Sequence, residues 1–147
     1  MYETHVEAEF EYGHRLAKPY PQDRKCANLH GHAGLVELHF RAFQLDSRNM
    51  VQDFDVKEPI KKILDEKLDH AMIVNIADTR LTQFLRRYHY KHYITYSNPT
   101  AEHLAYIVYE LLTPLRLPIY KVVFWEGRKT SATYYPDLFV SSRHASR

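Results

Sequence analysis

One cysteine and two histidines lie close together in the segment from residue 26 to residue 32, Cys-Ala-Asn-Leu-His-Gly-His. In extended backbone, side chains two residues apart point to the same face, so His30 and His32 can reach one metal ion together. Two imidazoles are half of a tetrahedral zinc site, and a third protein ligand with one open position would make that site catalytic. We predict His14 as this third ligand, because it follows a strand-like segment on the parity of that segment's apolar face.

Each of these residues also has an ordinary structural explanation when it is considered alone. The three histidines, out of ten in the chain, could be solvent-exposed residues of loops or strands. Cys26 is the only cysteine and could be a buried, unreactive thiol. Alternatively, the adjacent Lys25 and a nearby metal would favour its thiolate form. The residue types therefore leave a metal site and a structural explanation both open.

Two further positions carry carboxylates that fit proton transfer or ligand binding. Asp69 precedes His70, and the pair can transfer protons only where a helix ends, because adjacent helical residues do not face each other. The alternative is a histidine that stabilises a helix C-terminus. Glu126 follows a hydrophobic run, and its carboxylate could accept two N–H bonds from a guanidine-like edge, such as that of a pterin or a guanine. It could equally be an ordinary turn residue.

Strands that would position these residues follow from apolar periodicity. Residues 2–12 alternate apolar and polar side chains with a period of two, and residues 36–42 repeat this pattern. Residues 119–125 and 130–135 are two further β-prone runs. Each of these four segments is a predicted strand.

Helices are predicted between the second and third of these strands. One begins near Asp55, with Glu58 completing a capping-box-like start, and ends at about residue 68. Residues 81–88 suggest a short helix, which a strand or ordered loop follows. Another helix begins at residues 98–100 and ends at Pro114. The order of elements predicts an α+β fold with helices on one face of an antiparallel sheet.

Composition excludes several classes of protein. The length of 147 residues fits a single domain, 1–147, and the net charge of +2 gives no basic footprint for nucleic acid. No apolar run approaches the roughly 18 residues of a membrane span. The N-terminus is too acidic for a signal peptide, and one cysteine excludes an internal disulfide framework. We therefore expect a cytoplasmic protein without a membrane or nucleic-acid partner.

Six segments, in order along the chain, resemble the 6-pyruvoyl-tetrahydropterin synthase family. They are Phe10…His14-Arg15-Leu16, Lys25-Cys26…Leu29-His30-Gly31-His32, Met50-Val51-Gln52-Asp53-Phe54, Leu68-Asp69-His70, Asn98-Pro99-Thr100-Ala101-Glu102 and Glu126. Together they favour the functional explanation at each position. The three residues between the cysteine and His-Gly-His, and Asp53-Phe54 after Met-Val, are similar to the bacterial carboxy branch, the 6-carboxy-tetrahydropterin synthases of the queuosine pathway.

The resemblance implies a particular fold and assembly. The fold would be the tunnelling fold, a four-stranded antiparallel sheet with two helices on one face. Subunits would join their sheets into a barrel, as a trimer stacked into a homohexamer, with active sites between subunits. His14, His30 and His32 would hold Zn²⁺, the expected cofactor.

The resemblance also implies a reaction. The substrate would be 7,8-dihydroneopterin triphosphate, a small-molecule pterin. Cys26 would be the general base, Asp69 with His70 the second proton-transfer group, and Glu126 the anchor of the pterin ring, with Thr100 near it. Triphosphate would leave, and the carboxy branch would release acetaldehyde to give the 7-deazaguanine precursor. The alternatives are the pyruvoyl product from the same substrate, or a non-catalytic pterin-binding module.

Several positions depart from the family pattern. Tyr12 stands where small residues are usual, and Gly34 lies where an aromatic residue often follows His-Gly-His. Trp125 and Gly127 replace the usual neighbours of the anchoring glutamate, and the segment 71–97 is longer than expected. These departures border the expected pocket and leave the metal-binding and proton-transfer groups in place.

Overall fold

Two long strands form the centre of the fold. The computed structural model describes residues 1–136, in which β1 (Tyr2–His14) pairs antiparallel with β2 (His30–Ala42) along their whole lengths. β2 also pairs antiparallel with β5 (Ile119–Gly127), and β5 with β6 (Thr130–Tyr134). These are the four strands expected from the sequence, and alternate side chains of β1 are buried and exposed as the period-two pattern predicts.

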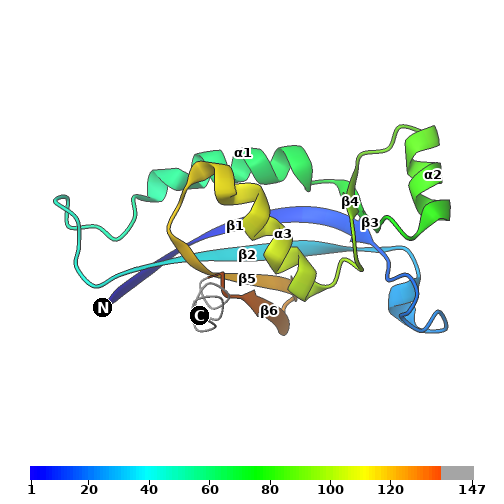
Figure 1. The fold of residues 1–147 in the computed structure, drawn as a ribbon, viewed down its shortest axis with the longest axis horizontal. Coiled ribbons are helices and arrows are strands. Elements are labelled where there is room, and N and C mark those ends of the chain that lie inside the picture. The colour runs from blue at the N-terminus through cyan, green and yellow to red at the C-terminus, as the bar shows by residue number, and fades with distance from the viewer. Residues whose placement is uncertain (137–147) are drawn as a thin grey trace, which may run out of the picture.

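Two short strands extend the sheet on the other side of β1. β3 (Ala71–Asn75) runs parallel to the last three residues of β1, and β4 (His92–Thr95) runs parallel to β3. The sheet therefore has six strands in the order β4-β3-β1-β2-β5-β6 (Figure 1). The prediction of a four-stranded, purely antiparallel sheet is wrong. β3 is almost wholly buried, so it lacks the alternation that identifies a half-buried strand.

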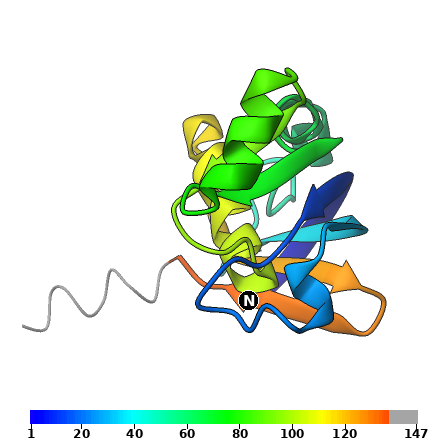
Figure 2. The ribbon, with the colours of Figure 1, turned by 90° about the vertical axis from the view of Figure 1, so that its right-hand side faces the viewer.

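The structure has three α-helices in residues 1–136: the two expected on one face of the sheet, and the short helix suggested at residues 81–88. α1 (Lys57–Lys67) and α3 (Ala101–Leu112) cover the same face of the sheet, as expected, and α2 (Thr79–Arg87) lies apart from them beside β3 and β4 (Figures 1 and 2). The start predicted for the first helix is wrong. Asp53, rather than Asp55, caps a 3₁₀ turn (Phe54–Val56), and α1 begins only after it.

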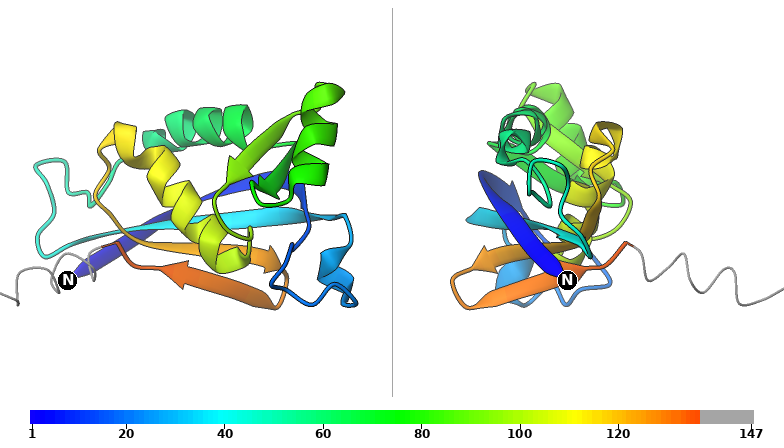
Figure 3. Two further views of the ribbon diagram at one scale, coloured as in Figure 1. Left: turned by 45° about the vertical axis from the view of Figure 1, so that its right-hand side comes forward. Right: turned by 90° about the vertical axis from the view of Figure 1, so that its left-hand side faces the viewer.

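The core lies between the sheet and the two covering helices (Figure 3). Phe10, Phe40 and Phe124 of the sheet pack with Leu64 of α1 and Leu104 of α3, and each is almost fully buried. Burial of each such side chain contributes about 1.5–3 kcal/mol to the stability of the folded chain. This packing holds the C-terminal end of β1 and the N-terminal end of β2 in a fixed register. No helix in residues 1–136 is long and apolar enough to cross a membrane.

Candidate metal centre and adjoining cavities

The structure brings His14, His30 and His32 together where β1 ends and β2 begins. The antiparallel register places His14 opposite His30, and Tyr12 opposite His32, so these side chains share the helix-covered face. The histidine ring centroids lie 4.5 to 5.1 Å apart, and one nitrogen from each ring lies within 4.8 Å of the other two. This spacing allows one cation to contact all three imidazoles.

Backbone carbonyls fix which ring nitrogens face the centre of the cluster. His14 Nδ1 donates to Pro99 O at 2.8 Å, and His30 Nδ1 donates to Asn28 O at 2.7 Å. The Nε2 atoms of these two rings face each other at 3.0 Å. If each ring carries its single proton on Nδ1, two lone pairs point at one another, and either a further proton or a cation must lie between them. Carbonyl partners of this kind commonly orient histidine ligands of metals.

Burial favours the neutral, metal-binding form of His14 and His32. Burial lowers the pKa of His14, which is 2% exposed, to about 4, so this ring is neutral near pH 7. Burial also lowers the pKa of His32, against the opposing effect of Glu126. The Nε2 atom of His32 is buried without a hydrogen-bond partner in the described residues, although Glu126 Oε1 lies 3.5 Å away. Neutral imidazoles with an unpaired inward nitrogen fit a zinc ion.

The segment before α3 holds this cluster in place. The side chain of Asn98 pairs with both backbone polar groups of Ala17: Ala17 N–H donates to Oδ1 at 2.9 Å, and Nδ2 donates to Ala17 O at 2.7 Å. The next residue supplies the carbonyl that orients His14, and Thr100 then caps α3 by accepting from His103 N–H at 3.4 Å. The sequence marked this segment as a helix start and as one of the six segments that resemble the family. Its second role depends on contacts 81 to 85 residues away along the chain.

A cavity of about 330 Å³ adjoins His14 and gathers three other predicted site residues, Cys26, Thr100 and Glu126. Cys26 is half-buried in a 3₁₀ turn (Lys25–Ala27), and its carbonyl accepts from Leu16 N–H at 2.8 Å. The remaining lining residues are Leu16, Ala101, Glu102, Thr130, Ser131 and Ala132. Sequence reasoning did not single out Glu102 or Ser131 as site residues. A thiol, two carboxylates and one histidine of the cluster therefore meet around one small cavity.

The Asp69–His70 pair lies on a different part of the surface. α1 ends at Lys67, and the left-handed φ of 56° at His70 turns its ring back, so that Nδ1 lies 2.7 Å from Asp69 Oδ2. Glu11 N–H donates to Asp69 Oδ1 at 2.9 Å. Although partial burial opposes the change, these hydrogen bonds lower the pKa of Asp69. The hydrogen bond to Asp69 raises the pKa of His70, so the pair is an oriented carboxylate–imidazole dyad.

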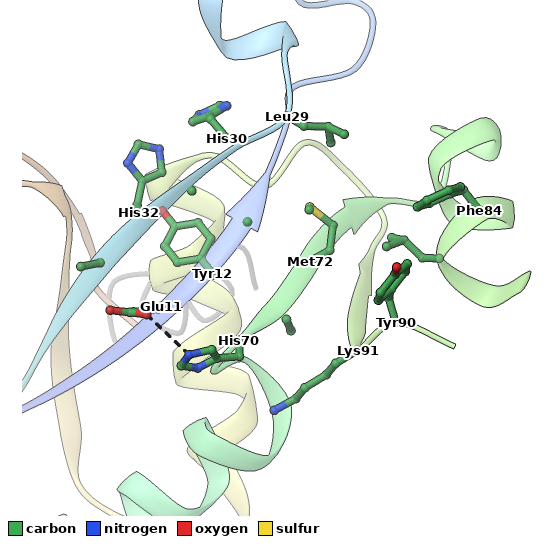
Figure 4. Close-up of a pocket in the computed structure, with 15 residues that line it drawn as sticks. Glu11, Tyr12, Leu29, His30, His32, His70, Met72, Phe84, Tyr90 and Lys91 are labelled. Atoms are coloured by element: carbon green, nitrogen blue, oxygen red, sulfur yellow. Dashed lines mark ion pairs between the residues drawn. The ribbon is translucent and has the colours of Figure 1, made fainter. Parts of the chain in front are cut away.

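His70 opens into a second groove, of about 860 Å³, that also contains His30 and His32 (Figure 4). Its other walls include Met72, Phe84 and Tyr90 from the β3–α2–β4 segment. Cys26, Thr100 and Glu126 do not line this groove, and His70 does not line their cavity. The His70 side chain is 72% exposed in the described chain. A single chain therefore places the three histidines between two cavities, with Cys26 and Glu126 on one and His70 on the other.

Comparison with known proteins identifies the family. A profile of the family described as 6-pyruvoyl tetrahydropterin synthase matches residues 3–137. The chain belongs to this family. It is 36% identical to a Rickettsia conorii 6-carboxy-5,6,7,8-tetrahydropterin synthase over 99 residues, 66% of this chain and 70% of the relative. It is 30% identical to the Aquifex aeolicus protein of the same name over 150 residues, 85% of this chain and 92% of the relative.

The fold agrees with this membership. The structure of Caenorhabditis elegans 6-pyruvoyl tetrahydropterin synthase superposes with a TM-score of 0.67 at 23% identity, covering 91% of this chain and 94% of that one. The resemblance seen in the sequence, including its closer likeness to the carboxy branch, is thus confirmed. The charge of Arg15, which follows His14, is paired within the chain: its guanidinium donates to Asp78 at 2.5 and 2.9 Å.

Proposed function

We propose that this chain is a zinc-dependent 6-carboxy-tetrahydropterin synthase. It converts 7,8-dihydroneopterin triphosphate to 6-carboxy-5,6,7,8-tetrahydropterin and releases acetaldehyde and triphosphate. The observation that carries this proposal is the facing pair of Nε2 atoms on His14 and His30, beside a cavity that Cys26 and Glu126 line. The relatives that are named 6-carboxy-5,6,7,8-tetrahydropterin synthases support the choice of product.

Within one subunit, each group has a distinct task. Zinc held by the three histidines supplies a Lewis acid that makes the hydroxyl groups of the substrate side chain more acidic. Glu126 accepts two N–H bonds from the pterin ring and so fixes its orientation in the cavity. Cys26, on the same cavity, removes and returns a proton as general base. Thr100 shapes the cavity from the N-terminus of α3, where its hydroxyl is already engaged as the helix cap.

The Asp69–His70 dyad acts in a site that is completed by a neighbouring subunit. Its imidazole is exposed in the single chain and lines a different groove from Cys26. Residues Tyr2–Phe10 of β1 pair only with β2 in the described part of the chain, and residues 130–133 of β6 have no strand partner on their outer edge there. Two open sheet edges favour pairing with further copies of the chain. This supports a barrel-forming trimer or hexamer in which the dyad of one subunit meets the cavity of another.

Product analysis with 7,8-dihydroneopterin triphosphate tests the reaction. We expect acetaldehyde and the 6-carboxy product, about one zinc per chain, and loss of turnover in Cys26→Ala with zinc retained. His14→Ala should lose both turnover and zinc. Formation of the pyruvoyl product without acetaldehyde would assign the sister activity. Absence of turnover with intact zinc would instead identify a non-catalytic pterin-binding module, which the altered pocket border at Tyr12 would then explain.

Mixing two inactive variants tests the shared site. Cys26→Ala and His70→Ala each disable one group, so mixed oligomers contain some sites with both groups intact if the groups come from different subunits. We expect activity to reappear after the two variants are dissociated and reassembled together. Reassembly of each variant alone is the control. No recovery in mixed oligomers of verified composition would show that both groups act within one chain.

A further inference from the structure

The hydroxyl group of Tyr12 is buried at the metal centre without a hydrogen-bond partner. The residue is 4% exposed, and its oxygen has no partner within residues 1–136. Its ring lies 5.2 Å from the His14 ring and 5.6 Å from the His32 ring, measured between centroids. The hydroxyl points toward His32 (Figure 4). The Nε2 atom of His32 is also buried and unpaired, so two unsatisfied polar atoms belong to one site.

An unpaired buried hydroxyl is unfavourable and uncommon in folded proteins. Phenylalanine at position 12 would make the same ring contacts with Phe10 and Phe124 and would avoid the desolvated oxygen. Packing alone therefore does not explain the tyrosine. A ligand that carries an acceptor oxygen and enters beside His32 would satisfy the group.

Gly34 makes the space that this ring occupies. A Cβ atom at Gly34 would lie 3.1 Å from Tyr12 Cε1 and 2.9 Å from Phe124 Cζ. The chain departs from the family pattern both at position 12 and at position 34, and the structure shows that the two departures are physically coupled. The ring on β1 takes the room that a side chain on β2 would need. This arrangement places a phenol, rather than a plain hydrocarbon surface, next to His32.

We propose that Tyr12 is a substrate-binding residue that donates a hydrogen bond to an oxygen of the hydroxylated side chain of the pterin. This inference rests on the proposed function and specifies which part of the substrate the residue recognises. The phenol needs an acceptor within the pocket, and a side-chain oxygen bound near the metal supplies one. Tyr12 lines the groove with His30 and His32, whereas Glu126 lines the other cavity, so Tyr12 distinguishes pterins by the side chain at C6 rather than by the ring.

Binding of two unreactive pterins to the zinc-loaded protein tests the inference by calorimetry. Neopterin carries the hydroxylated side chain, whereas pterin has only hydrogen at C6. Tyr12→Phe should weaken neopterin binding about five- to tenfold, the usual effect of one hydrogen bond, and leave pterin binding unchanged. Equal effects on both ligands, or none, would overturn the role of Tyr12. Failure of the unaltered protein to bind either pterin would instead overturn the proposed function.

Thermal unfolding of the ligand-free protein separates this role from a structural one. Tyr12→Phe removes a hydroxyl without a partner, so its melting temperature should equal or exceed that of the parent. Tyr120→Phe is the matched control, because the Tyr120 hydroxyl donates to Glu3 on the other face of the sheet. That variant should melt lower and bind neopterin normally. A lower melting temperature for Tyr12→Phe would show that its hydroxyl has a structural partner and would contradict the inference.

Discussion

Replacement of Gly34 by alanine should destabilise the fold, because two rings already fill the space beside it. The added methyl group would lie 2.9 and 3.1 Å from two atoms of Phe124, and 3.1 Å from Tyr12 Cε1. Phe124 is fully buried and Tyr12 nearly so, which leaves neither ring an open direction in which to move. Gly34 does not have a positive φ, so backbone strain plays no part.

The size of the effect follows from two opposing terms. An extra methyl group in a packed core costs about 1–3 kcal/mol. Alanine also reduces the conformational freedom of the unfolded chain, which stabilises the protein by about 0.4–1 kcal/mol. The net loss should be about 1–2 kcal/mol, which lowers the urea midpoint by about 0.5–1 M for a slope near 2 kcal/mol/M.

Urea unfolding at one chain concentration, with zinc held constant, measures this loss. Gly127→Ala is the matched control, because the nearest atom to its added methyl group is Thr130 Oγ1 at 3.8 Å. This control should leave the midpoint unchanged or slightly higher. Phe124→Leu should be less harmful in the Gly34→Ala background than alone, because it removes the ring atoms that clash. Equal midpoints for Gly34→Ala and Gly127→Ala would refute the packing described around Tyr12.

Three further substitutions test contacts that support the site. Asp78→Ala removes the N-cap of α2 and leaves the partly buried Arg15 guanidinium unpaired. The free energy of unfolding, measured in urea, should therefore fall by about 2–3 kcal/mol. A fall of less than about 1 kcal/mol would contradict the pairing. Asn98→Ala releases the loop after His14. In competition with a chelator, the variant should lose zinc faster than the parent, although it binds the same amount of zinc per chain. An unchanged rate of zinc loss would contradict the role of Asn98. Hydrogen bonds from a tyrosine and a histidine lower the pKa of Glu3 from 4.5 to about 2. Its stabilising effect is therefore complete above pH 4.5 and is lost as the pH falls toward 2, so the stability difference between the parent and Glu3→Gln should shrink over that range. A difference that does not vary with pH would contradict the Glu3 assignment.

The sequence predicted the parts of the fold that local patterns determine. The alternation in β1 and β2 reflects a sheet buried on one face, and the same parity correctly placed His14 beside His30 and His32. The end of α1 before Asp69 was also predictable, because the apolar stripe stops there. β3 was missed, and β4 was anticipated only as a strand or ordered loop after the short helix, because parallel pairing joins distant segments and its register depends on the tertiary structure.

The site was only partly predictable for a related physical reason. Side-chain chemistry can be inferred from residue types, but the carbonyls of Asn28 and Pro99 that orient the imidazoles belong to the backbone and have no signature of their own. The pairing of Asn98 with Ala17 crosses 81 residues. The unpaired hydroxyl of Tyr12 became visible only when its surroundings were known, although its unusual position had marked it in the sequence.

The proposed division of the site between chains leads to a prediction about dilution. The zinc ligands and their carbonyl partners all lie in one chain, whereas His70 lies outside the Cys26 cavity. Zinc bound per chain should therefore stay constant as the oligomer is diluted, while specific activity falls with the fraction of assembled protein. Chelator competition, turnover and analytical ultracentrifugation at matched chain concentrations measure the three quantities. Zinc loss in parallel with activity would show that the metal centre itself needs a second subunit, and full activity in the isolated chain would show that His70 acts within its own subunit.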